Sequence, residues 1–148
     1  MPNTKQLSVI LVVIEDSDED FETFTEGVKQ SGVMAEVRRA TTGDAGLTLL
    51  RELAPGRPVI VIMDLNTPAT DGRAALAEIK ADPALRTIPV VVFSTSANPK
   101  DIGLCYAAGA NAYHVKPVCH PNHLQLVIVL ASYWVNSAAL AVVGGTHL

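Results

Sequence analysis

The sequence predicts an α/β protein built on a doubly wound, five-stranded parallel sheet. Five predicted strands, most of them short apolar runs rich in β-branched residues, alternate with five segments of helical periodicity along the 148 residues. Such alternation is typical of a parallel sheet that carries helices on both faces. The run at residues 59–63 has no polar face, as expected of a strand covered on both sides. A chain of this length can form one domain with a full core.

Each predicted strand has its own signature. Residues 7–14 are apolar throughout and are expected at the centre of the sheet, whereas the second strand, near 35–39, is short and more polar. The third strand, 59–63, follows a proline and ends on a carboxylate. The fourth, 89–93, contains three consecutive valines, and the fifth, 112–115, ends just before a Lys-Pro pair.

The predicted helices are recognised by their first residues. Ser17 followed by Asp20 resembles a capping box, in which the serine hydroxyl accepts a hydrogen bond from the helix backbone. Thr42 opens the second helix, and Asp71-Gly72 is interpreted as the opening of the third, which continues over residues 73–81. The fourth and fifth helices are expected to start near residues 100 and 122.

Composition and charge exclude several classes of protein. The net charge is -4 and no basic run is present, which argues against a nucleic-acid partner. The two cysteines, Cys105 and Cys119, form no Cys-x-x-Cys motif and are interpreted as reduced thiols of a cytoplasmic protein. No signal-peptide pattern is found at the N-terminus. We expect residues 1–6 to be flexible.

Polar side chains stand at the ends of four predicted strands. These are Glu15 and Asp16, Asp64, Ser94 and Thr95, and Lys116. Because parallel strands place their carboxyl ends at one edge of the sheet, we expect these groups to converge. Crowded carboxylates suit Mg²⁺, and a lysine with a hydroxyl suits a phosphoryl group. An aspartate in such surroundings can act as an aspartyl-phosphate nucleophile.

The order of these groups resembles the receiver domains of two-component response regulators, which have a flavodoxin-like fold. The resemblance covers about residues 7–133, and it leaves residues 134–148 as a C-terminal extension. It implies that Asp64 is the phosphoacceptor. It also implies that Mg²⁺ is bound by Asp16, Asp64 and the backbone carbonyl of Asn66, with Glu15 acting through water. A cis peptide between Lys116 and Pro117 is a further implication.

The same resemblance implies roles for the groups that respond to phosphorylation. Ser94 matches the switch hydroxyl, with Thr95 as the alternative if the register slips by one residue. Lys116 matches the lysine that pairs with the phosphoryl group, and Tyr113 matches the aromatic residue that reports the phosphorylation state.

A narrower resemblance points to the single-domain regulators that partner cyanobacterial and bacterial phytochromes. It rests on residues 15–21, on residues 96–102 and on the pair Tyr133-Trp134. It implies a signalling protein, not an enzyme, that receives a phosphoryl group from a histidine kinase of the phytochrome type. Only 15 residues follow Tyr133 (148 − 133), so no output domain is expected after it.

Three alternatives remain at the level of sequence. A phosphatase of the haloacid-dehalogenase type needs an acid two residues after the nucleophile, but Asn66 stands there and cannot donate a proton at neutral pH. A receiver-like scaffold that is never phosphorylated is disfavoured because the acidic residues and the lysine are all present. The pair His120 and His123 could suggest a metal site, but one such pair is more often incidental.

The last predicted helix and the tail carry no charge over residues 124–143. Only one stripe of this helix can face its own sheet, so we expect a homodimer through the fourth and fifth helices, the last strand and the tail. The predicted contact residues are Leu126, Val127, Leu130, Tyr133, Trp134 and Leu140. Twenty residues could also span a membrane, but the first half is needed to cover the sheet, and no membrane anchor is expected.

Overall fold

Five strands form one parallel sheet, as predicted. The computed structural model describes residues 8–65 and 69–142, with side chains from residue 72 onward in the second range. The strands are β1 (Val9–Ile14), β2 (Ala35–Ala40), β3 (Val59–Asp64), β4 (Val90–Ser94) and β5 (Ala112–Val115). Their order is β2-β1-β3-β4-β5, and every neighbouring pair is parallel. The predicted fold class is therefore confirmed.

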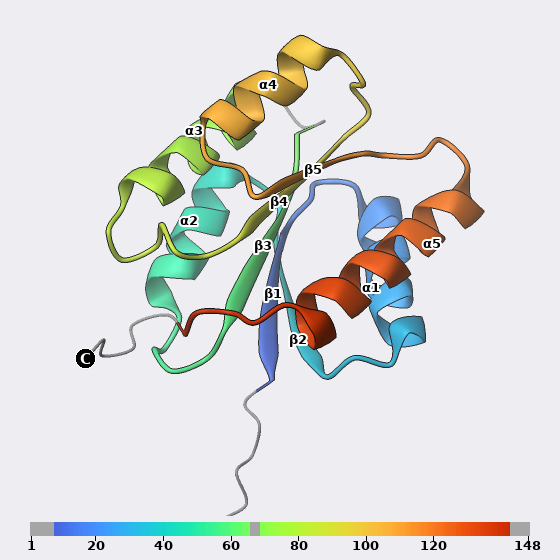
Figure 1. Ribbon diagram of the computed structural model, residues 1–148, viewed down its shortest axis with the longest axis horizontal. Helices are drawn as coiled ribbons and strands as arrows, with labels where there is room; N and C mark the ends of the chain where they lie inside the picture. Colours follow the sequence, from blue (N-terminus) through green and yellow to red (C-terminus); the bar gives the residue numbers. More distant parts are fainter. Residues whose placement is uncertain (1–7, 66–68, 143–148) are drawn as a thin grey trace, which may run out of the picture.

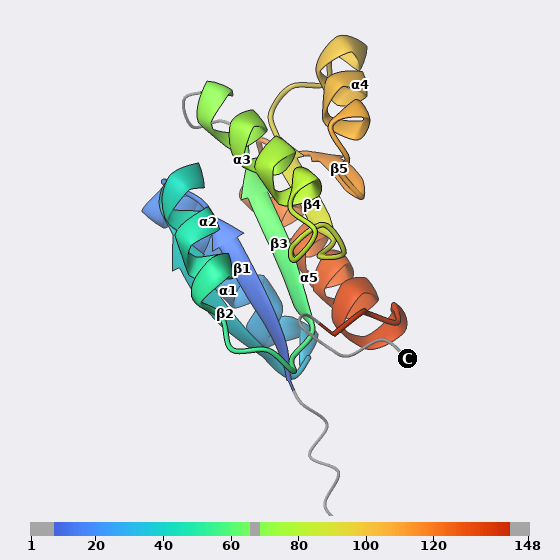
Figure 2. The same ribbon diagram turned by 90° about the vertical axis from the view of Figure 1, so that its left-hand side faces the viewer.

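Helices cover both faces of the sheet (Figures 1 and 2). One face carries α1 (Asp18–Ser31) and α5 (His120–Ala131), and the other carries α2 (Gly43–Glu52), α3 (Ala69–Ala81) and α4 (Pro99–Ala107). Alternate residues of β1 belong to the two cores, so that Leu11 faces α1 and α5 while Val12 faces α2 and α3. All six residues of β1 and of β3 are buried, as expected of central strands that are covered on both faces.

Two helix boundaries differ from the sequence prediction. Helix α3 begins at Ala69 and runs through Gly72, so Gly72 is inside the helix and does not mark its start. A Cβ atom at Gly72 would lie 2.5 Å from Cδ2 of the buried Leu65, so a larger residue there would require the Leu65 side chain to shift. Helix α5 begins at His120, two residues early, because Pro121 fits the first helical turn, where no backbone N–H partner is required.

The segment after α5 folds back onto the domain. A π-helical turn, η1 (Ser132–Ser137), continues α5, and the chain then crosses the amino-terminal end of the sheet (Figure 1). There Val142 forms an isolated antiparallel bridge with Pro58. Trp134 and Leu140 pack against the core beneath α1 and α5. No helix in the described part of the chain is long and apolar enough to cross a membrane.

This packing corrects part of the predicted dimer surface. Val127 is 0% exposed and Leu130 is 3% exposed, since both lie against the protein's own sheet. They cannot also meet a second copy. Leu126, Trp134 and Leu140 are partly buried on the same core, which leaves Tyr133, at 54% exposure, as the one freely exposed member of the predicted set.

Candidate functional site

The predicted strand-end groups meet at the carboxyl edge of the sheet. Glu15 follows β1, Asp64 is the last residue of β3, and Lys116 follows β5. Their side chains are buried, with exposures of 6%, 4% and 6%. The backbone N–H of Lys116 donates to the Ser94 carbonyl at 2.7 Å. This bond continues the pairing of β5 with β4 and holds Lys116 at the carboxyl edge of the sheet.

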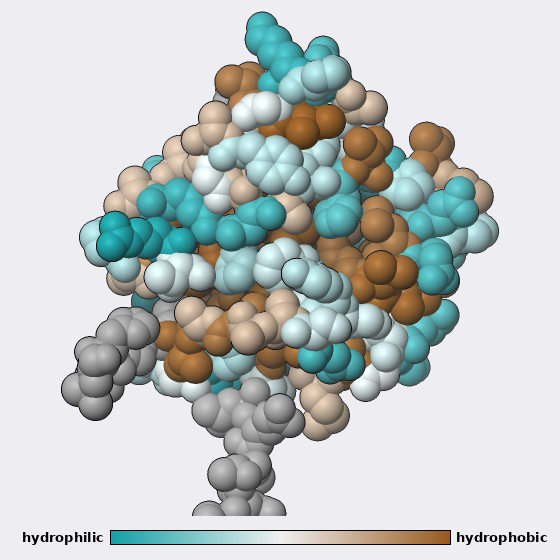
Figure 3. Space-filling model, viewed as in Figure 1, coloured by the Kyte–Doolittle hydropathy of each residue, from teal (hydrophilic) through white to brown (hydrophobic). Residues whose placement is uncertain are grey.

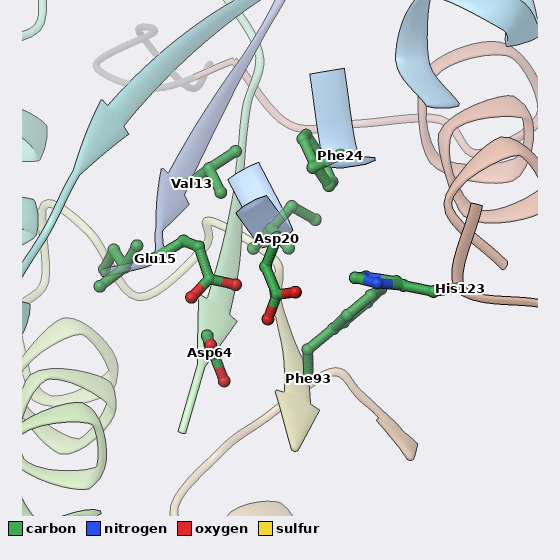
Figure 4. Close-up of a pocket in the computed structure, with 9 residues that line it drawn as sticks. Val13, Glu15, Asp20, Phe24, Asp64, Phe93 and His123 are labelled. Atoms are coloured by element: carbon green, nitrogen blue, oxygen red, sulfur yellow. The ribbon is translucent and has the colours of Figure 1, made fainter. Parts of the chain in front are cut away.

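The ammonium of Lys116 lies among three carboxylates. Its Nζ donates to Asp20 Oδ2 at 2.7 Å, to Asp64 Oδ2 at 2.9 Å and to Glu15 Oε1 at 3.2 Å. Figure 4 shows the three acidic side chains turned toward one another. Lys116 and Glu15 are 101 residues apart in the chain, so only the parallel sheet brings them together.

Asp20 is a member of this group that sequence reasoning assigned to another role. The Ser17 hydroxyl accepts from the Asp20 backbone N–H at 3.2 Å, so the serine half of the predicted capping box forms. The Asp20 carboxylate does not complete the box, because it turns to Lys116 instead. The sequence signal that could have identified Asp20 is its place in the first turn of the helix that follows β1, because that helix starts beside the carboxyl edge of the sheet.

Burial and crowding shift the pKa values of the central pair. Burial, followed by the hydrogen bond and negative charge of Asp64, raises the pKa of Glu15 to about 8. Burial alone would lower the pKa of Lys116, but its bonds to Asp20 and Asp64 outweigh that effect and raise the pKa above its usual value. The lysine is therefore a cation at neutral pH, held by an excess of negative charge.

The donor set fits a hard divalent cation. Glu15, Asp20 and Asp64 each offer a carboxylate oxygen, and these oxygens lie within 4.8 Å of one another. Asp16, a predicted ligand, is exposed and is not part of this group, and Asn66 lies outside the described residues. His123 is buried beside the Phe93 ring while His120 is exposed, and neither histidine belongs to the acidic group.

The other side of the site carries hydroxyl groups and a phenol. Ser94 ends β4 and is buried, Thr95 next to it is exposed, and the Tyr113 hydroxyl donates to the Ser96 carbonyl at 2.8 Å. The Ser96 hydroxyl donates to Asp101 at 2.6 Å, and Arg73 donates to the same carboxylate at 3.2 Å. The sequence analysis missed this link between α3, α4 and the loop after β4.

The Lys116–Pro117 peptide differs from the sequence-based expectation. Within the described residues all peptide bonds are trans. The implied cis peptide is therefore not found.

Comparison with known proteins identifies the family. The model of the response regulator receiver domain matches residues 10–128. The chain belongs to the response regulator receiver family. It is similar to the response regulator Rcp1 of Synechocystis, with 34% identity over 136 residues, which cover 88% of this chain and 92% of Rcp1.

Solved receiver structures agree with this assignment. The phosphorylated cyanobacterial phytochrome response regulator RcpA has a TM-score of 0.82 and 35% identity, covering 90% of this chain and 98% of RcpA. The Mn²⁺-bound form of Rcp1 has a TM-score of 0.81 and 32% identity, covering 89% of this chain and 98% of Rcp1. This receiver is thus related to phytochrome response regulators.

Proposed function

We propose that this receiver accepts a phosphoryl group on Asp64 from a histidine kinase and that the transfer requires Mg²⁺. The supporting observation is the Asp64 carboxylate, which is buried at the end of β3, 2.9 Å from the Lys116 ammonium and beside further acids. One Asp64 oxygen bonds to phosphorus while the bond from phosphorus to the donor imidazole nitrogen breaks. The imidazole leaves with the electron pair and takes a proton from solvent.

Each surrounding group has a proposed part in this transfer. Asp16, Asp64 and the backbone carbonyl of Asn66 would hold the metal, with Glu15 acting through water, and the metal would neutralise charge on the phosphoryl oxygens. Asp16 is exposed beside Glu15 and is free to turn toward a cation at the mouth of the site. Lys116 pairs with one phosphoryl oxygen.

The responding groups lie on the β4–β5 side of the site. Ser94 donates a hydrogen bond to a second phosphoryl oxygen, and Thr95 is the alternative donor. Tyr113 reports the change, because its hydroxyl is bonded to the loop that follows Ser94.

The relationship to RcpA and Rcp1 supports a phytochrome-type histidine kinase as the donor. We place this signalling protein in the cytoplasm, where such a kinase would present its phosphohistidine. It is not an enzyme with a separate substrate, since it assists phosphorylation and dephosphorylation of its own side chain. The net charge of -4 supports a protein partner over nucleic acid.

The function is tested by metal-dependent labelling. The protein is incubated with acetyl phosphate and Mg²⁺ and its intact mass is measured. We expect the mass of one added phosphoryl group, removed by hydroxylamine as an acyl phosphate should be, and no addition after chelation with EDTA. Labelling that persists in EDTA, or a label that resists hydroxylamine, would contradict the proposal.

We also propose that the protein forms a homodimer through α4, β5 and α5. Five large apolar side chains are exposed on these elements and on the turn that follows: Leu104, Tyr106, Val115, Val129 and Tyr133. Strand β5 is an edge strand, so the flanking helices share a surface with it. Figure 3 shows hydrophobic patches over α5 and the segment that leads into it. A second copy would remove this surface from water.

A charge placed on this surface is expected to give a monomer. Leu104 is 45% exposed and Val129 is 56% exposed, so Leu104→Glu and Val129→Glu leave the core intact but desolvate a carboxylate in the dimer. Light scattering at micromolar concentration measures the outcome. Met34→Glu is the matched control, because Met34 is 78% exposed before β2, away from this surface. A monomeric wild type would refute the dimer.

A further inference from the structure

Asp20 makes the shortest of the three bonds to Lys116. The distance is 2.7 Å, against 2.9 Å for Asp64 and 3.2 Å for Glu15. Unlike the other two acids, Asp20 comes from a helix, where it stands in the first turn of α1. Its side chain is 30% exposed, so it can move without opening the core.

The local structure does not use this carboxylate for any other purpose. The first turn of α1 is capped by the Ser17 hydroxyl, which accepts a hydrogen bond from the backbone N–H of Asp20. The Asp20 carboxylate takes no part in this cap and is available to Lys116. The neighbouring acids serve elsewhere or face solvent: Asp18 pairs with Arg39, and Glu19 is exposed. Of the three acids in this turn, Asp20 alone joins the strand-end group.

We propose that Asp20 is a positioning residue that holds Lys116 in the unphosphorylated protein and competes with the phosphoryl group for it. This inference rests on the proposed function of Asp64. A phosphoryl group on Asp64 needs the ammonium of Lys116 as its counter-charge, and the ammonium already donates to three acids, so it has to give up one of them. Asp20 is the one that can turn away, because its side chain is partly exposed whereas Glu15 and Asp64 are buried. The negative charge of Asp20 also repels the incoming phosphoryl oxygens. Both effects have the same sign, so Asp20 restrains the phosphorylated state.

Beryllofluoride, which imitates the phosphoryl group on an aspartate, provides the test. We expect Asp20→Asn to bind beryllofluoride at saturating Mg²⁺ roughly threefold to tenfold more tightly than the wild type, which corresponds to about 0.7–1.4 kcal/mol. Isothermal titration calorimetry measures this affinity. The matched control is Glu19→Gln, which removes one charge from the same helical turn at an exposed position. It should bind as the wild type does.

A second readout is independent of phosphorylation. In metal-free protein labelled with ¹⁵N-lysine, the Lys116 ammonium resonance, assigned by its loss in Lys116→Arg, should shift in Asp20→Asn and stay in place in Glu19→Gln. An unshifted resonance in Asp20→Asn would contradict the pairing. If Asp20→Asn binds beryllofluoride no more tightly than the wild type, the competition is refuted.

Two further outcomes distinguish this inference from a metal-binding role of Asp20 and from a failure of the function proposed for Asp64. Asp20 also belongs to the carboxylate group that could hold a cation, so calorimetry with Mg²⁺ alone separates the two roles. If Asp20 serves Lys116 and the metal is held by the other acids, Asp20→Asn and wild type should have affinities within about threefold of each other. A loss as large as that of Asp64→Asn would make Asp20 a metal ligand and overturn the proposal. If wild type and Glu19→Gln both fail to bind beryllofluoride, the function proposed for Asp64 fails, whereas a failure confined to Asp20→Asn counts against Asp20 only.

Discussion

Asp64→Asn is expected to abolish phosphoryl incorporation while the protein remains folded. The amide has nearly the shape of the carboxylate but lacks the charged oxygen that attacks phosphorus. The fold should tolerate the change, because it removes one of three acids that crowd around Lys116. With acetyl phosphate and Mg²⁺, we expect labelling to fall by at least about two orders of magnitude. Intact mass spectrometry measures the loss, and thermal unfolding verifies the fold.

Two matched variants separate the nucleophile from the groups that act afterwards. Ser94→Ala and Thr95→Ala remove the hydroxyls beside the site, and both should still be labelled on Asp64, because a hydroxyl that stabilises the product is not needed for the attack. Persistent labelling of Asp64→Asn would overturn the assignment. Peptide mapping would then show whether Asp16 or Asp20 carries the group.

Gly27→Ala is expected to destabilise the protein by about 1–3 kcal/mol, although glycine to alanine in a helix ordinarily stabilises by up to about 1 kcal/mol. A Cβ atom at Gly27 would lie 2.6 Å from Cγ1 and 2.7 Å from Cβ of Val127. The Val127 Cβ is fixed to the backbone of α5, so no side-chain rotation relieves the clash. Helices α1 and α5 would have to separate over a core position with 0% exposure.

Gly103→Ala provides the control for this prediction. Gly103 lies in α4, and a Cβ atom there would meet nothing within 4 Å. Its replacement should be neutral or stabilising by up to about 1 kcal/mol, from helix propensity alone. Urea denaturation of both variants gives the two free energies of unfolding. A Gly27→Ala variant as stable as Gly103→Ala would mean that the contact between α1 and α5 is looser than described.

The sequence by itself determined the sheet and the core of the site. Short apolar runs that are rich in β-branched residues and have no polar face are typical of strands buried on both faces, and their alternation with helical segments indicates a parallel sheet. Parallel strands share one carboxyl edge, so Asp64 and Lys116 could be placed together although 52 residues separate them. These features follow from local patterns and from a rule of topology, and both are visible in a single chain.

Only the tertiary structure decided where the helices point their side chains. The sequence pattern predicts a helix-capping role for Asp20, whereas its pairing with Lys116 depends on how α1 is rotated against the sheet. The uncharged stretch after residue 124 likewise could not be divided by sequence. Val127 faces the core, whereas Val129 faces solvent, and Leu140 packs on the core because the chain turns back after η1. Helix rotation and chain reversal are set by packing between distant elements, and hydrophobic composition alone does not specify which apolar side chain finds which partner.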